Sequence, residues 1–203
     1  WNYTTKSNDL FIRQATYPTA SAEQADFTIN PNGEGATGAG CLYDELIFHV
    51  LDKNTFQLWP NDFSGTSGLY GSYRATCGGG RGYNFEYPMN TREWRKKAMD
   101  FLDIIPDGSY VVVRNNGNPN NDGNTYSNVW QSDTAVYGHN NSLYHRLLLQ
   151  GFADIDSFNR ARAWVFVYRK NSASTFEPVS KFTVDAYDKI AFGVFCPTPH
   201  SNG

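Results

Sequence analysis

The chain has 203 residues, enough for one large domain, and only 18% of them are charged while 16% are aromatic. The net charge of −3 and the lack of a long basic run exclude a nucleic-acid partner, and no segment has the apolar length needed for membrane insertion. Many Tyr, Trp, Asn, Gly and Ser with few Lys and Glu are typical of secreted recognition domains, so we expect an extracellular or cell-surface location. Because the sequence begins at Trp1 without Met or a signal sequence, we expect a mature product or an excised domain. We also expect the chain to be part of a larger multidomain protein.

The first third of the chain predicts short strands. Residues 1–22 are polar and indicate an irregular lead-in, with at most a short edge strand at 10–12. Alternating apolar residues predict a strand at 26–30, and a nearly continuous apolar run predicts a second one at 45–51. A tight turn at 52–54 then leads into residues 56–59, which favours a β-hairpin.

The next part of the chain predicts a loop, a helix and a strand. Residues 60–83 are rich in Gly, Ser, Thr and Tyr and favour a long surface loop, followed by a short strand at 84–87. Asn90 or Thr91 is the expected N-cap of a helix that continues to about residue 105. We expect its four basic residues to lie on a solvated face, and they are Arg92, Arg95, Lys96 and Lys97.

The helix-to-strand order occurs twice. The first helix leads to the apolar strand 110–113, and a second helix at 143–152 leads to the strand 164–168. Apolar residues at consecutive positions indicate strands buried on both faces, covered by helices or by a second sheet, and place Trp164 in the core. Between the two units, residues 115–141 form a polar insertion too long for a simple connection, which indicates a functional or mobile loop. A last strand is expected at 189–196.

The cysteines and the Asn-rich loop bear on disulfides and metals. Cys41, Cys77 and Cys196 have no metal-site spacing, and one disulfide plus one thiol is the simplest arrangement, with the pairing left open. No cofactor is expected. Ca²⁺ is the ion that the Asn-rich loop could hold, through alternating oxygens at Asn118, Asn120, Asp122 and Asn124, although the EF-hand carboxylates are missing.

A set of short motifs in fixed order suggests a family. The helix ending in Ile105-Pro106-Asp107-Gly108 precedes Val111-Val112-Val113, and the second helix ends in Leu147-Leu148-Leu149-Gln150-Gly151. Ala163-Trp164-Val165-Phe166-Val167 follows, and Phe195-Cys196-Pro197 closes the series. This order resembles the interleukin-like EMT inducer (ILEI) domain family over residues 42–197.

The resemblance implies a fold and a division of the chain. We expect a compact α/β fold with two small β-sheets, flanking helices and two long loops. Residues 1–41 would be an N-terminal extension with a first strand, 42–197 the ILEI-like domain, and 198–203 a tail.

The resemblance also implies a function. The family includes secreted cytokine-like proteins, bacterial surface proteins and the sugar-binding stem domain of protein O-mannose N-acetylglucosaminyltransferase. We therefore expect a non-catalytic carbohydrate-binding module whose partner is a glycan, a polysaccharide or glycoprotein. A sugar-binding member uses an acidic residue just after the strand equivalent to 111–113, where this chain has Asn115 and Asn116. It also uses an Arg three positions before the Trp, where this chain has Ala161 between Arg160 and Arg162.

Sugar recognition requires a flat aromatic face and planar amide, carboxylate or guanidinium groups. The candidate ligand-binding residues combine these groups from the two long loops and from the positions implied by the family. They are Trp130, Tyr73, Arg74, Arg81, Asn116, Asp122, Arg160 and Arg162. The alternative is a protein-interaction or adhesion module without a sugar site.

An enzyme is not expected. Among His49, His139, His145 and His200, only His139 is well placed for chemistry, and no neighbouring nucleophile motif supports it. The acidic pairs near helix ends are more typical of solvation than of paired acid and base catalysis. A hydrolase that uses the long loops is the third and weakest alternative.

Overall fold

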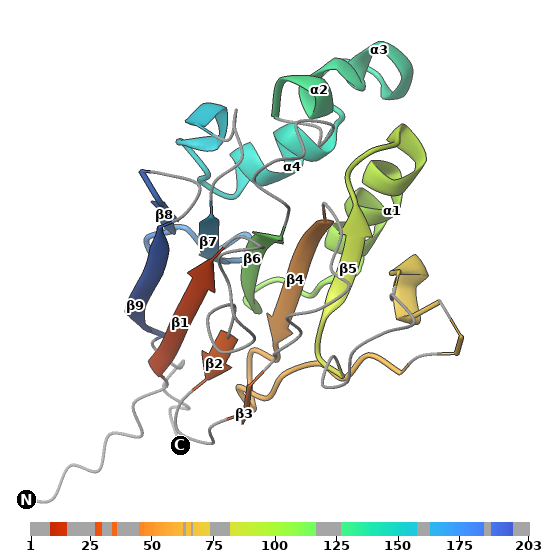
Figure 1. Cartoon of the computed structure of the whole chain (residues 1–203). Coiled ribbons are helices and arrows are strands. Elements are labelled where there is room, and N and C mark those ends of the chain that lie inside the picture. Colours follow the sequence, from red (N-terminus) through yellow and green to blue (C-terminus); the bar gives the residue numbers. More distant parts are fainter. Residues whose placement is uncertain are drawn as a thin grey trace, which may run out of the picture.

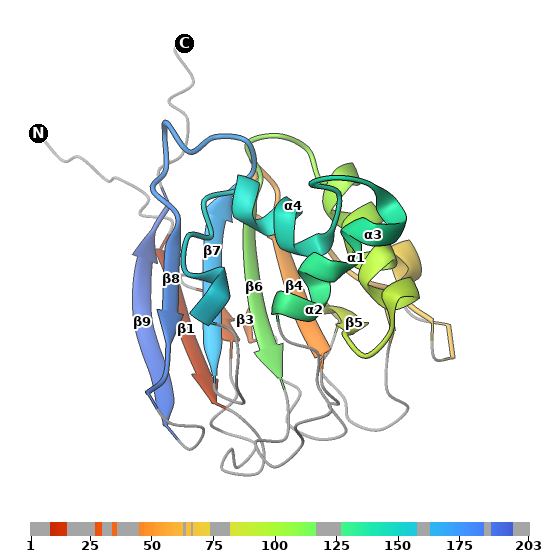
Figure 2. The same ribbon diagram turned by 90° about the horizontal axis from the view of Figure 1, so that it is seen from above.

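The computed structural model describes residues 9–15, 27–29, 34–35, 45–62, 64–65, 67–73, 82–116, 127–157, 163–184 and 188–196. These residues form three layers: a small sheet, a larger sheet and a layer of helices (Figure 1). Figure 2 shows the helices gathered over one face of the larger sheet. The structure therefore confirms a mixed α/β fold with two sheets and flanking helices.

Both sheets are antiparallel at every pairing. The small sheet has the order β3 (Glu34–Gly35), β2 (Phe27–Ile29), β1 (Asp9–Ala15) and β9 (Lys189–Phe195). The larger sheet has the order β5 (Phe85–Pro88), β4 (Glu45–Leu51), β6 (Tyr110–Asn116), β7 (Trp164–Arg169) and β8 (Val179–Phe182).

The helical layer consists of short elements around one longer helix. They are η1 (Leu69–Gly71), α1 (Arg92–Ile104), α2 (Ser127–Ser132), α3 (Thr134–Tyr137), α4 (Leu143–Leu149) and η2 (Ile155–Ser157). Thr91 begins α1 as the expected N-cap, because its side chain accepts a hydrogen bond from the Trp94 amide. At the other end of α1, the Lys170 ammonium donates to the carbonyls of Leu102 and Ile105.

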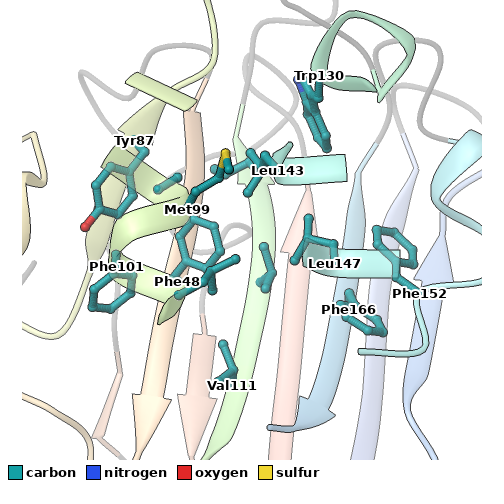
Figure 3. Packing of buried hydrophobic residues seen from close by; sticks show 14 of the residues in the cluster. Phe48, Tyr87, Met99, Phe101, Val111, Trp130, Leu143, Leu147, Phe152 and Phe166 are labelled. Carbon is teal, nitrogen blue, oxygen red and sulfur yellow. The ribbon is translucent and has the colours of Figure 1, made fainter. Parts of the chain in front are cut away.

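The central strands are buried on both faces, as their consecutive apolar residues predict. Side chains alternate along a strand, so Phe48 and Phe166 pack against the helices while Val112 and Val165 pack against the small sheet. Trp164 is fully buried, which confirms its place in the core. Figure 3 shows the helix-side core, in which Phe152 stacks on Phe166 with ring centroids 4.4 Å apart.

Two predictions for the strands are wrong, and one strand was missed. Residues 10–12 were expected at an edge, but β1 lies between β2 and β9 and buries Leu10 and Ile12. The predicted hairpin partner at 56–59 is reduced to one isolated bridge between Leu51 and Leu58. Strand β8 was not predicted, because its four residues are only partly buried or exposed and carry a weak apolar pattern.

The described part of the predicted surface loop 60–83 is anchored at the buried residues Asn61 and Ser72, while most of its other residues are exposed. Asn61 is buried and its side-chain amide donates to the Asn84 carbonyl at 2.7 Å and to the Ser72 hydroxyl at 3.0 Å. Its side-chain oxygen accepts from the Leu69 amide. The side chain of one asparagine thus bonds two backbone groups and one hydroxyl, and polar contacts hold this part of the chain.

The predicted loop 115–141 also contains regular structure. Asn115 and Asn116 end β6, and residues 127–137 form α2 and α3. Residues 117–126, which include the expected Ca²⁺ ligands, lie outside the described residues.

Candidate functional site

A polar hollow of about 390 Å³ lies on the helical layer, between α2, α3, the turn that follows α3, and α4. This volume falls within the ~300–1,000 Å³ of small-ligand sites. The described side chains that line the hollow are amides, hydroxyls and imidazoles. They belong to Asn128, Gln131, Ser132, Thr134, His139, Asn140 and His145.

Helix α2 is held in place by Trp130. This side chain is fully buried and points from α2 toward the sheet (Figure 3). Asn128, Gln131 and Ser132 therefore lie away from the buried stripe of the same helix, because side chains one and two positions from Trp130 leave in other directions. The polar side of α2 forms one wall of the hollow.

A buried ion pair ties the α2–α3 junction to α1. The Asp133 carboxylate is fully buried and accepts from Arg95 through Nε at 2.6 Å and through a terminal nitrogen at 2.8 Å. Arg92 adds a third contact at 3.1 Å, and Arg95 also donates to the Met89 carbonyl at 2.7 Å. Bidentate geometry of this kind fixes orientation as well as distance. Arg95 was predicted on the solvated face of its helix, and this prediction is wrong.

The opposite wall of the hollow comes from the turn after α3 and from α4. Asn140 has φ = 56°, a left-handed conformation that Asn tolerates better than most residues. The Asn141 side chain donates to the Tyr137 carbonyl at 2.8 Å and closes the turn. Ser142 caps α4 by accepting from the His145 amide, and its hydroxyl lies 2.9 Å from His145 Nδ1.

The lining can both donate and accept hydrogen bonds. The hydroxyls of Ser132 and Thr134 donate to the helix carbonyls of Val129 and Gln131, at 2.7 and 2.9 Å. Their oxygens keep acceptor capacity toward the hollow, while side-chain amides supply both donors and acceptors. The arrangement suits a ligand rich in hydroxyl groups.

Burial lowers the pKa of His145, and the neighbouring His139 lowers it further. The neutral form of His145 is therefore favoured. Each neutral imidazole has one donor and one acceptor nitrogen, and protonation turns both nitrogens into donors.

Two predicted site residues are described in full by the structure, and neither lines the hollow. Trp130 was expected to present its ring to a ligand, but it has no exposed surface and this expectation is wrong. Tyr73 is half-buried, its ring packs edge-on against Trp94 at 5.9 Å, and its amide donates to the Glu86 carbonyl at 2.7 Å. Tyr73 thus extends the β5 edge of the larger sheet.

The family-implied positions are only partly described. Asn115 is buried, and its side-chain oxygen accepts from the Trp164 amide at 2.9 Å, which ties the end of β6 to the start of β7. Asn116 ends β6 in register with Glu45. The remaining predicted site residues, Arg74, Arg81, Asp122, Arg160 and Arg162, lie outside the described residues.

A second polar cluster lies buried on the face of the larger sheet that is turned toward the small sheet. Arg114 Nε donates to His49 Nε2 at 3.0 Å, and His49 Nδ1 donates to the Tyr83 carbonyl at 3.2 Å. Burial, reinforced by the Arg114 charge, lowers the pKa of His49 well below its usual value. Glu45 and Glu86 are buried on the same face. These side chains have no exposed surface, so the hollow is the better candidate for binding.

A groove of about 600 Å³ runs between the edge strands β8 and β9, which lie side by side in Figure 2. Phe195 is 64% exposed at this groove, and Gly193 and Pro178 form part of its wall. This groove has a more apolar character than the hollow.

The described residues were also compared with the patterns of metal sites and membrane-spanning helices. No group of three or more His, Cys, Asp or Glu side chains that could hold a metal ion occurs among them. Within the same residues, no helix is long and apolar enough to cross a bilayer. Cys196 is buried, and Cys41 and Cys77 lie outside the described part, so the predicted disulfide is not tested.

Two comparisons with known proteins gave no match. No family model matches the chain, and a search of curated proteins found no match. The resemblance to the ILEI family therefore stays a prediction, although the expected two-sheet architecture is present.

Of the residues that line the hollow, sequence reasoning singled out His139, and only as the histidine best placed for chemistry; it expected function in either of the two long loops, 60–83 and 115–141. It missed the polar face of α2 because a segment rich in Asn and Ser has no apolar periodicity of its own. The spacing of Asn128, Gln131 and Ser132 around the single Trp130 is the signal that would have indicated a short helix with one polar face.

Proposed function

We propose that this chain is a non-catalytic carbohydrate-binding module of a secreted or cell-surface protein, and that the hollow between α2, α3 and α4 holds the sugar. The observation that carries the proposal is the lining, in which the described side chains are amides, hydroxyls and imidazoles. A sugar presents hydroxyl groups that need both donors and acceptors, and these side chains supply both.

The support of the hollow favours binding over catalysis. The buried Trp130 ring and the buried Asp133–Arg95 ion pair fix the helices that form its walls, so the polar groups are in position before a ligand binds. Binding then loses less conformational entropy. The described lining residues include no carboxylate, and paired carboxylates are the usual catalytic groups of glycoside hydrolysis.

Affinity electrophoresis against a panel of polysaccharides tests the proposal. We expect retardation by at least one polysaccharide and a loss of about 3–10-fold in affinity for Gln131→Ala, the value of about one hydrogen bond. Gln57→Ala is the matched control, because Gln57 is an exposed glutamine in the turn after β4. Retardation by no member of the panel, or equal affinities of the two variants, would contradict the proposal.

A protein-interaction module is the second candidate, and the groove between β8 and β9 favours it. Strand β9 pairs with β1 on one side, and no described strand pairs with its other side. An unpaired edge beside an exposed Phe195 suits an extended peptide that adds as a further strand.

Peptide display tests this second candidate. Selection on the wild-type protein should enrich extended apolar peptides, and Phe195→Glu should abolish their binding. Val184→Glu is the control, because Val184 is 85% exposed and does not line the groove. Absence of enrichment, or equal binding by both variants, would rule out a peptide site at the groove.

A further inference from the structure

The charges around the hollow are distributed unevenly. The charged side chains on the elements around the hollow form ion pairs with α1 and do not line the hollow. Asp133 pairs with Arg95 and Arg92 on α1, and Arg146 of α4 pairs with Asp103 of α1 at 3.0 Å. The segments Ser127–Ser132 and Thr134–Tyr137 contain no charged residue at all.

The tyrosines near the hollow do not supply a charge either. Tyr137 points its hydroxyl at the Arg92 carbonyl, at 3.4 Å. Tyr144 is buried, and its hydroxyl donates to the Asp156 carboxylate of η2 at 3.1 Å. That carboxylate therefore already has a partner. The titratable groups among the described lining residues are therefore the imidazoles of His139 and His145.

We propose that the hollow selects an anionic sugar, a glycan that carries uronic acid carboxylates, and holds the carboxylate with the protonated side chains of His139 and His145. This inference rests on the proposed function and names the ligand class of the same site. A lining that has only amides and hydroxyls would accept neutral sugars equally well. When protonated, the two imidazoles add positive charge, and no described carboxylate in the lining opposes it.

The geometry accommodates the charged form of His145. In the neutral ring, Nδ1 lies 2.9 Å from the Ser142 hydroxyl. After protonation, Nδ1–H can donate to the same oxygen, so the second N–H is left for the ligand. The serine thus serves as the N-cap of α4 and as an orienting partner of the imidazole in both charge states.

The sign of the pH dependence follows from linkage. A bound carboxylate favours the protonated form of an imidazole beside it, so binding of the carboxylate is coupled to protonation. Binding then takes up protons, and affinity rises as the pH falls. We expect about tenfold tighter binding of a uronate at pH 5 than at pH 7.5, since each partly exposed ion pair contributes a few-fold.

Calorimetric titration with trigalacturonate and with its fully methyl-esterified form provides the test. The two ligands share their rings and hydroxyls and differ in the carboxylate charge. We expect the acid form to gain affinity from pH 7.5 to pH 5 while the ester stays constant. In the His139→Asn, His145→Asn double variant, the gain should disappear and binding of the ester should remain.

A charge-matched control separates the hollow from the overall charge of the protein. Lys53→Gln with Lys181→Gln removes two positive charges at exposed positions elsewhere, so this variant should keep the gain. An equal loss of the gain in both double variants would overturn the inference, as would equal pH profiles for the acid and the ester. If neither ligand binds at any pH and no other polysaccharide does, the proposed function fails together with the inference.

Discussion

His49 shows how one buried side chain makes the stability of the protein depend on pH. It is neutral in the folded state, because burial lowers its pKa and Arg114 Nε donates to its Nε2. In the unfolded chain its pKa returns to about 6.5. Below that pH the unfolded state binds a proton that the folded state does not, so this contribution to stability is complete above pH 6.5 and is lost as the pH falls.

We therefore expect the free energy of unfolding to fall by up to about 1.4 kcal/mol per pH unit below pH 6.5 through His49 alone. Urea denaturation between pH 7.5 and 5 measures this. His49→Gln keeps an acceptor for Arg114 without a titrating ring, and its slope should be shallower than that of the wild type. Identical slopes would show that His49 does not titrate on unfolding.

Asp133 ties the α2–α3 wall of the hollow to α1 through its buried ion pair. Asp133→Asn leaves the Arg95 guanidinium buried without its countercharge, and we expect a loss of about 3–5 kcal/mol in the free energy of unfolding. Asp100→Asn removes the exposed pair with Lys96 and should change stability by less than about 1 kcal/mol. Equal losses of unfolding free energy for the two substitutions in chemical denaturation would show that the buried pair stabilises the protein no more than the exposed pair does.

The polar face of helix α2 can bind a glycan only if the buried Trp130 side chain holds the helix in place. Trp130→Ala should cost about 3–5 kcal/mol in stability and weaken glycan binding by displacing the helix. Trp130→Phe retains a ring in the core and should bind glycan almost as the wild type does. If Trp130 contacted the sugar directly, binding to the folded Trp130→Phe protein would fall markedly in titrations, and this result would contradict the structure.

The elements that sequence could predict are those whose pattern is local. Strands β4, β6 and β7 have consecutive apolar residues, and α1 has a cap and an apolar stripe, so their types and approximate bounds follow from neighbouring residues. The contact between Asp133 and Arg95 joins residues 38 positions apart, and no local pattern indicates it. The same reason explains why α2 was taken as part of a loop and its polar face was missed.

In the whole molecule, the three layers differ in the apolar cores that they contact. The larger sheet lies between two cores, whereas the described side chains of the small sheet belong to only one of them. Amide hydrogen exchange followed by mass spectrometry should find the slowest exchange in β4, β6 and β7, and faster exchange in the edge strands β8 and β9. Protection that is equal across both sheets would contradict this difference between the layers.

The central claim is that the hollow on the helical layer is where this protein holds a glycan. The most direct measurement is a two-dimensional NMR titration of ¹⁵N-labelled protein with trigalacturonate and its methyl ester at pH 5. We expect the largest shifts at Asn128, Gln131, His139 and His145, with the β8–β9 groove unchanged. Shifts confined to the neighbourhood of Tyr73 or to Phe195 and Gly193, with the hollow unaffected, would contradict the claim.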